Sequence, residues 1–249
     1  MHPLYAPGEG PASGITCDLD RFEPAQPSGR LHRAFSVFLF DHENRLLLQQ
    51  RAHSKITFPG VWTNTCCSHP LFGYDPTEVD TPEDVAAGRA PGTVRVRRQY
   101  RAPLALLFHS LLSSPHAPQA ALRKLDHELG IRPSSLDPAA FRFLTRLHYC
   151  AADQDPSSGA STGWGEHEMD YILLVRAAVQ CQPNPEEVAE VKYVTLEELR
   201  AMMDPASGLR WSPWFRIIAE RFLEPWWRDL DAALTTSKHV DATGIYKVM

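Results

Sequence analysis

The chain has 249 residues, enough for one large domain or two small ones with a sizeable core. Its formal net charge of −5 and its ordinary fractions of hydrophobic (43%) and charged (22%) residues argue against a nucleic-acid-binding protein. The sequence contains no apolar run of about 18 residues, so it predicts no membrane span. The five cysteines, with one adjacent pair, form a poor disulfide framework and favour a reducing compartment.

The first 30 residues are expected to form a loose N-terminal tail, because they are rich in Pro, Gly and Ser and have no hydrophobic period. They carry neither the basic start nor the apolar segment of a targeting signal. A cytoplasmic location is therefore expected, with a plastid or mitochondrion as the alternative if a leader is missing.

A β-hairpin is expected next, because residues 32–40 and 45–52 are strand-like and flank the polar segment 41–44. Pro59-Gly60 marks a turn, and residues 61–71 continue as a short strand running into a loop. Residues 72–92 lack periodicity and are expected to form a surface loop.

The second half alternates strands with helices. Residues 120–131 have helical spacing, with leucines on one stripe and Gly130 as a stop. Residues 141–151, 167–179 and 190–196 are strand-like. Thr195 and Glu198 predict a capping box, and Ser212-Pro213 begins a helical segment to residue 234 with an expected kink at Pro225. This order of elements predicts a mixed α+β domain.

One candidate for chemistry is Cys67-Ser68-His69. A thiol beside an imidazole could supply a nucleophile, an acid/base pair or metal ligands. A structural zinc site needs four ligands, and no second Cys-x-x-Cys or His-x-His pair is present. A buried loop with small cysteines is the simpler alternative.

A second candidate is the carboxylate pair Glu166 and Glu168, which share one face of a strand because they are two residues apart. Parallel carboxylates favour a cation between them or protonation of one, although a solvated acidic face would have the same pattern. Glu128 lies in the last turn of its helix, where the helix dipole disfavours a negative charge. An external cation would explain it, and an ordinary amphipathic helix is the alternative.

Two further features could bind a charged ligand. Arg51 and Lys55 are suited to gripping a diphosphate, although such pairs usually face solvent. Trp214, in the first turn of the last helical segment, could steady a cation with its indole face, or could be a core residue.

Taken together, the residues of these stretches and their order along the chain closely resemble eukaryotic type I isopentenyl-diphosphate isomerases over residues 31–90 and 119–249. The resemblance implies a Nudix fold, with a mixed β-sheet sandwiched between helices. It places a single domain at 31–234, followed by a C-terminal tail at 235–249. It also implies a monomer that acts on a small isoprenoid diphosphate and has no nucleic-acid or membrane partner.

The resemblance assigns roles position by position. Cys67, Glu168 and Tyr149 match catalytic positions. The ligands of a tightly bound divalent metal would be His32, His69, Glu166 and Glu168, and Glu128 would meet a Mg²⁺ carried on the diphosphate. Arg51, Lys55, Ser68 and Trp214 match substrate-binding positions. The metal is expected to be Mg²⁺, with Mn²⁺ or Zn²⁺ as alternatives at the His/Glu site.

The implied reaction is a 1,3-allylic shift that interconverts isopentenyl and dimethylallyl diphosphate. It needs an acid and a base at separate places around the substrate. Glu168, helped by Tyr149, is expected to be the acid and Cys67 the base in the forward direction, and the reverse reaction exchanges these roles. An aromatic wall would protect a tertiary carbocation from water.

A Nudix diphosphate hydrolase is a less favoured reading. Its signature contains three glutamates, and two of them are replaced here by Lys124 and His127. Those carboxylates would hold metals on a diphosphate under attack by water. A hydrolase would also leave Cys67 unexplained.

Two departures from the family favour a second alternative, a catalytically impaired paralogue or variant acting as a non-catalytic protein. Arg21 lies about where the family has another metal-binding histidine, so four protein ligands are expected instead of five. A diphosphate-binding lysine of the family is also missing upstream. Residues 93–118 intervene before the helix, as a surface insertion or as a splicing or gene-prediction artefact.

Overall fold

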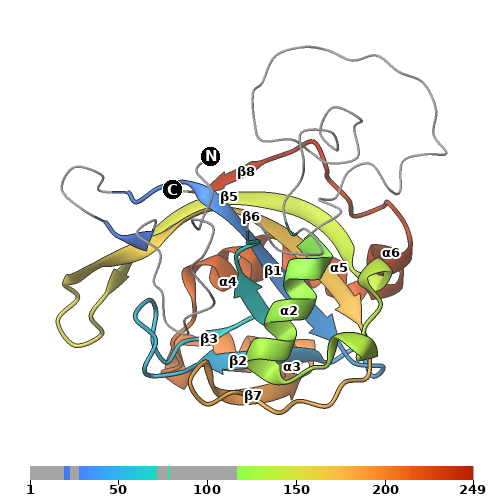
Figure 1. The fold of residues 1–249 in the computed structure, drawn as a ribbon, viewed down its shortest axis with the longest axis horizontal. Helices are drawn as coiled ribbons and strands as arrows, with labels where there is room; N and C mark the ends of the chain where they lie inside the picture. The colour runs from blue at the N-terminus through green and yellow to red at the C-terminus, as the bar shows by residue number, and fades with distance from the viewer. Residues whose placement is uncertain (1–19, 23–27, 72–77, 79–116, 249) are drawn as a thin grey trace.

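The computed structural model describes residues 20–22, 28–71, 78 and 117–248 (Figure 1). The atypical segment 93–118 lies outside these residues, except that residues 117 and 118 begin a helix. Most of the expected N-terminal tail and of the expected loop 72–92 is likewise outside the described part of the chain.

A mixed sheet of eight strands forms the centre of the described structure (Figure 1). Its main path runs β3-β2-β1-β6-β5-β8, while β4 pairs with β1 and β7 pairs with β2. The strands are β1 (His32–Phe40), β2 (Leu46–Arg51), β3 (Trp62–Thr63), β4 (Cys66–Ser68), β5 (Arg142–Gln154), β6 (Ser161–Arg176), β7 (Val188–Val194) and β8 (Tyr246–Val248). The expected hairpin is confirmed as the antiparallel pair β1 and β2.

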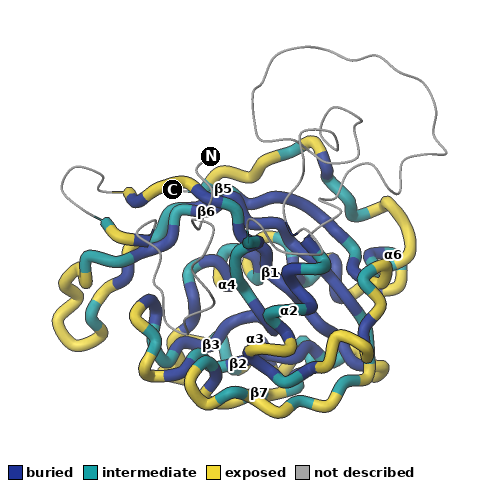
Figure 2. The backbone as a smooth tube through the Cα atoms, in the orientation of Figure 1, coloured by how far each residue is buried: buried dark blue, intermediate teal, exposed yellow. Residues whose placement is uncertain are grey.

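Side chains of β1 alternate between two hydrophobic cores, one on each face of the sheet. Val37 and Leu39 belong to the core under helix α2 (Ala117–Leu129), whereas Phe38 and Phe40 belong to the core under the C-terminal helices. Successive side chains of a strand point to opposite faces, so a strand covered on both sides is apolar throughout. Figure 2 shows this buried backbone between the helices on either side.

Helix α2 follows the expected pattern, because Leu122, Leu125 and Leu129 are all buried against the sheet. The helix ends before Gly130, whose φ of 62° lies in the left-handed region. A Cβ atom at this position would also lie 2.7 Å from the carbonyl oxygen of Gln182. Gly130 is therefore required both by the backbone conformation and by the close approach of the next segment.

The remaining helices are α3 (Leu196–Met203), α4 (Pro213–Ile218), a π-helical turn (Ala219–Leu223), α5 (Glu224–Arg228) and α6 (Leu230–Thr235), with 3-10 turns at Pro133–Ser135, Pro138–Ala140 and Pro205–Ser207. The capping box of Thr195 and Glu198 is confirmed. Ser212 caps α4 as expected. The interruption expected at Pro225 takes the form of the π-helical turn that precedes it.

The last strand, β8, was not predicted from the sequence. It runs parallel to β5 and lies within the segment 235–249 that was expected to be a tail. None of the helices in the described ranges is long and apolar enough to cross a membrane.

Candidate metal centre and catalytic site

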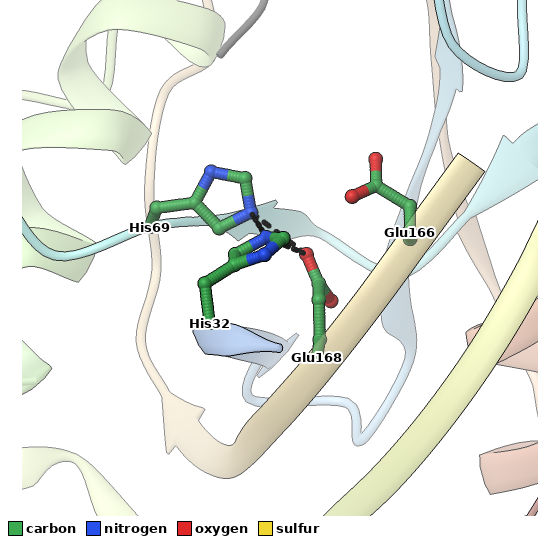
Figure 3. A group of neighbouring side chains, drawn as sticks. All are labelled: His32, His69, Glu166 and Glu168. Atoms are coloured by element: carbon green, nitrogen blue, oxygen red, sulfur yellow. Dashed lines mark hydrogen bonds and ion pairs between the residues drawn. The ribbon is translucent and has the colours of Figure 1, made fainter. Parts of the chain in front are cut away.

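Four side chains, which we call the His/Glu cluster, converge at one end of the central strands: His32, His69, Glu166 and Glu168 (Figure 3). The parallel pairing of β1 with β6 sets His32 directly beside Glu168. Glu166 and Glu168 share a face of β6, as expected from their spacing. All four residues expected to hold the tightly bound metal are therefore brought together.

Distances within the cluster suit a shared cation. The Nε2 atoms of His32 and His69 are 3.1 Å apart, and Nε2 of His69 lies 2.7 Å from Oε1 of Glu168. One ligand atom from each of the four residues lies within 4.8 Å of the others. Neighbouring octahedral ligands at about 2.1 Å from a metal lie about 3 Å apart. The cluster can thus close around a divalent cation with small side-chain adjustments.

The orientation of His32 also suits a metal ligand. Its Nδ1 lies 2.8 Å from the carbonyl oxygen of Arg30, and only an N–H group can make that hydrogen bond. In the neutral ring, Nε2 is then the unprotonated nitrogen and faces the cluster. This use of the second ring nitrogen is typical of metal-ligating histidines.

The pKa values of the two glutamates are shifted in opposite directions. Burial raises the pKa of Glu166 well above its usual range, and the negative charge of Glu168 adds to this effect. Burial also opposes ionisation of Glu168, but hydrogen bonds from His32 and His69 outweigh it and lower the pKa of Glu168. A cation between the ligands would stabilise the anionic form of both carboxylates.

Tyr149 connects the cluster to an aromatic wall. Its hydroxyl donates a 2.5 Å hydrogen bond to Oε2 of Glu168, which it faces across the β5–β6 pairing. Its ring lies 6.1 Å from that of Trp214. The indole of Trp214 is fixed because Nε1 donates to the side-chain oxygen of Asn64 at 3.1 Å. Glu168, Tyr149 and Trp214 therefore form one continuous group, as expected.

The adjacent cysteines lie on opposite faces of the sheet. Cys66 belongs to the core under α2, whereas Cys67 packs toward the core that contains Tyr149 and Trp214. Burial and the negative charges of Glu168 and Asp170 raise the pKa of the Cys67 thiol. Cys67 is thus the cysteine on the same face of the sheet as Tyr149 and Trp214.

Arg51 reaches the same face because the sheet is irregular beside it. The pairing of β2 with β7 shifts register between Gln50 and Arg51. The Arg51 guanidinium lies 5.8 Å from the ring centre of Trp214 and donates to the carbonyl oxygen of Thr57 at 2.9 Å. A regular strand would have placed Arg51 on the same side as Gln49, under α2.

A separate group of side chains, which we call the α2 charge cluster, contains Gln49, Lys55, Lys124, Glu128 and Glu187. Glu128 is buried and accepts from Gln49 at 3.0 Å, while Nζ of Lys124 lies 3.0 Å from its other oxygen. Lys55 pairs with Glu187 at 2.6 Å. In the described part of the chain, the side chains of Glu128 and Lys55 therefore have their hydrogen-bond and ion-pair partners within the α2 charge cluster and not within the His/Glu cluster.

Ser68 pairs with Phe35, which belongs to the core under α2, whereas Cys67 pairs with Ser36, so the Ser68 side chain lies on the face of the sheet opposite Cys67. The catalytic, substrate-binding and metal-binding roles of the site residues, including those of Ser68, Lys55 and Glu128, stay predictions.

Three features of the site were missed in the sequence. Asp20 is 6% exposed and lies 3.5 Å from Nε2 of His32, although it belongs to the expected tail. Ser36 donates to Asp170 at 2.7 Å beside Cys67. Asn64 holds Trp214. The alternating acidic residues of 166–170 include Asp170 and could have indicated it, but no periodic pattern indicated that Asp20 belongs to the site.

Comparisons with known proteins agree with this geometry. A family model described as NUDIX domain matches residues 114–215. The "Isopentenyl-diphosphate delta-isomerase" of Schizosaccharomyces pombe is 48% identical over 206 residues, covering 82% of this chain and 73% of the relative. The protein of the same name from Phaffia rhodozyma is 43% identical, covering 95% and 78%. "Isopentenyl-diphosphate Delta-isomerase 1" of Bos taurus is 44% identical, covering 82% and 73%. The chain belongs to the isopentenyl-diphosphate delta-isomerase family of the Nudix superfamily.

Proposed function

We propose that this chain interconverts isopentenyl and dimethylallyl diphosphate by a metal-assisted protonation and deprotonation. The observation that carries the proposal is the convergence of Glu168, Tyr149, Cys67 and Trp214 on one face of the sheet beside the His/Glu cluster. This arrangement supplies separate proton-transfer groups and an aromatic surface, which the allylic shift requires.

The His/Glu cluster is the proposed site of a divalent metal, with Mg²⁺ expected and Mn²⁺ or Zn²⁺ as alternatives. The buried Oε2 of Glu166 has no hydrogen-bond partner, which supports a cation as its missing partner. When bound, the metal would orient Glu168 and stabilise negative charge in the site. A second Mg²⁺ carried by the diphosphate would meet Glu128.

Proton transfer is proposed to occur at two places. Glu168 and Tyr149, joined by their 2.5 Å hydrogen bond, would deliver a proton to the substrate alkene in the forward direction. The Cys67 thiolate would accept a proton from another carbon. Burial and nearby negative charge raise the pKa of the thiol, and a cation bound by Glu168 would favour the thiolate by offsetting that charge. The reverse reaction would use the same groups with exchanged roles.

Binding of the carbocation and diphosphate is proposed to use Trp214 and the nearby cations. The buried indole would stabilise a tertiary carbocation through its π face and exclude water that would trap it. Arg51 lies against the same indole, so its forked guanidinium could hold the diphosphate next to the reacting carbons. Lys55 and Ser68 are proposed as further diphosphate contacts.

Hydrolysis is a poorer fit to the same site. Lys124 and His127 stand in place of two signature glutamates, so Glu128 is the one carboxylate left of the three that a hydrolase would use for metal binding. A hydrolase also has no use for the Cys67 thiol.

The adjacent cysteines offer a matched test of the proposal. Purified chain would be assayed for dimethylallyl diphosphate formation with Mg²⁺ or Mn²⁺, beside the Cys67→Ala and Cys66→Ala variants. We expect Cys67→Ala to lose turnover by at least a hundredfold. Cys66→Ala should keep turnover and lose only stability, because its thiol is buried on the other face.

Equal activity of the two variants would contradict the role of Cys67. A folded parent chain without turnover would instead favour the impaired, non-catalytic alternative.

A further inference from the structure

We infer that Asp20 is a fifth protein ligand of the divalent cation held by the His/Glu cluster. The inference rests on the proposed metal site and would add one ligand to the four that were expected there.

Residues 20–22 are held against the beginning of β6. Arg21 forms an antiparallel bridge with Trp164, and its guanidinium lies 5.3 Å from the centre of that indole ring. The backbone N–H of Phe22 donates to the carbonyl oxygen of Gly163 at 2.9 Å. An antiparallel bridge at Trp164 places the preceding residue, Asp20, on the side of β6 that leads into Glu166.

Gly165 allows this approach. A Cβ atom on Gly165 would lie 2.5 Å from the ring of Phe22 and 2.5 Å from the carbonyl oxygen of Ala151. The missing side chain at Gly165 therefore leaves room for Phe22, which anchors the segment that carries Asp20.

The Asp20 carboxylate is buried beside the cluster rather than exposed to solvent. The residue is 6% exposed, and Oδ1 is 3.5 Å from Nε2 of His32. This oxygen is buried and has no hydrogen-bond partner, like Oε2 of Glu166. Burying anionic oxygens without donors is costly, and a cation between them would remove that cost. Two unsatisfied oxygens thus flank the same ligand set.

Charge balance supports the same assignment. The site has three acidic groups, Asp20, Glu166 and Glu168, and the positive charge of Arg51 acts on Asp20 and on Glu166. With both histidines neutral, a divalent cation and Arg51 together would neutralise all three carboxylates. Without a cation, burial raises the pKa of both Asp20 and Glu166, which shows that the anionic forms of these carboxylates lack sufficient positive partners.

The donor set also determines which metals fit. Three carboxylates and two imidazoles are richer in oxygen than a site with a third histidine would be. Carboxylates suit hard cations such as Mg²⁺ and Mn²⁺, whereas imidazoles favour Zn²⁺ and other borderline metals. Asp20 therefore biases the site toward Mn²⁺ and Mg²⁺ and away from Zn²⁺.

The test measures metal binding directly by titrating full-length chain with MnCl₂ or ZnCl₂ in a calorimeter. Asp20→Asn keeps the size of the side chain and removes its charge, and Asp20→His restores a strong donor of a different class. Asp155→Asn, at an exposed turn of the β5–β6 hairpin, is the matched control.

We expect Asp20→Asn to weaken Mn²⁺ binding by at least about 10- to 100-fold. Losing a residue that only supports a ligand already has an effect of this size, and losing a direct ligand should cost no less. Metal-free Asp20→Asn should melt no lower than the parent, because it removes a buried negative charge. Asp20→His should bind metal and shift the ratio of Zn²⁺ to Mn²⁺ affinity toward Zn²⁺ by at least tenfold.

Unchanged Mn²⁺ affinity in a folded Asp20→Asn chain would overturn the inference and leave the four-ligand site intact. So would a metal-free Asp20→Asn chain that melts lower yet binds Mn²⁺ like the parent, since that indicates a purely structural role. A parent chain that binds neither metal would overturn the proposed metal site itself, and Asp20 with it.

Discussion

Lys124, in the α2 charge cluster, replaces a glutamate of the Nudix hydrolase signature. Removing its charge tests how much its ion pair with Glu128 stabilises the fold. The side chains of Lys124 and Glu128 are 14% and 7% exposed, and their closest N–O distance is 3.0 Å. Lys124→Met would remove the cation paired with the Glu128 carboxylate and leave the hydrogen bond from Gln49 in place. Breaking a buried ion pair from one side costs roughly 3–5 kcal/mol. Because Gln49 still donates, we expect the free energy of unfolding to fall by about 2–3 kcal/mol.

Chemical denaturation in metal-free buffer measures this change. At about 2–4 °C per kcal/mol for a chain of this size, the melting temperature should fall by roughly 4–12 °C. The double variant Lys124→Met/Glu128→Gln leaves no unpaired charge and should recover most of the loss. Lys238→Met breaks an exposed pair with Asp229 and should match the parent within error.

The sign of the pH dependence follows from the same pair. Burial opposes ionisation of Glu128, but Lys124 and Gln49 outweigh it and lower the pKa of Glu128. A carboxylate with a lowered folded pKa contributes stability above its unfolded pKa, and this stability is lost as the pH falls. The difference between parent and Lys124→Met should therefore shrink in acid. A single variant as stable as the parent, or a double variant as unstable as the single, would refute the reasoning.

Three further changes have defined outcomes. Arg51→Lys should raise the KM for isopentenyl diphosphate about tenfold or more in steady-state assays, because an ammonium lacks the forked geometry of guanidinium; an unchanged KM would exclude a diphosphate contact. Tyr149→Phe removes the hydrogen bond to Glu168 and should lower kcat about tenfold or more with little change in KM; an unchanged kcat would exclude its part in proton delivery. Hydrogen bonds from Ser157 and Ser158 lower the pKa of Asp155 to about 2, so its carboxyl NMR signal should titrate near that pH. The stabilising effect of Asp155 should be lost as pH falls from about 4 toward 2, and titration at an ordinary pKa would exclude this effect.

Local patterns predicted much of the fold. The hairpin, the leucine stripe of α2 with Gly130, and the capping box of Thr195 each depend on residues close in sequence, and all are confirmed. The convergence of His32, His69, Glu166 and Glu168 was expected from family resemblance, because no local rule brings residues from two strands and a loop together.

Long-range pairing accounts for what was missed. β8 is a three-residue strand whose only cue is its partner β5, more than 90 residues away in the chain. Asp20 is positioned by the bridge between its neighbour Arg21 and Trp164, and the surrounding sequence has no periodicity that would predict this bridge. Arg51 turns toward Trp214 through a register shift that depends on β7. Such features depend on tertiary context and cannot be derived from spacing.

The most direct test of the central claim is NMR of the purified chain mixed with isopentenyl diphosphate and Mg²⁺. Isomerase activity predicts that the two vinylidene protons give way to the single alkene proton of dimethylallyl diphosphate. The ³¹P signals of the diphosphate should persist without free phosphate. Release of phosphate, or unchanged substrate in the presence of folded, metal-loaded chain, would contradict the assignment.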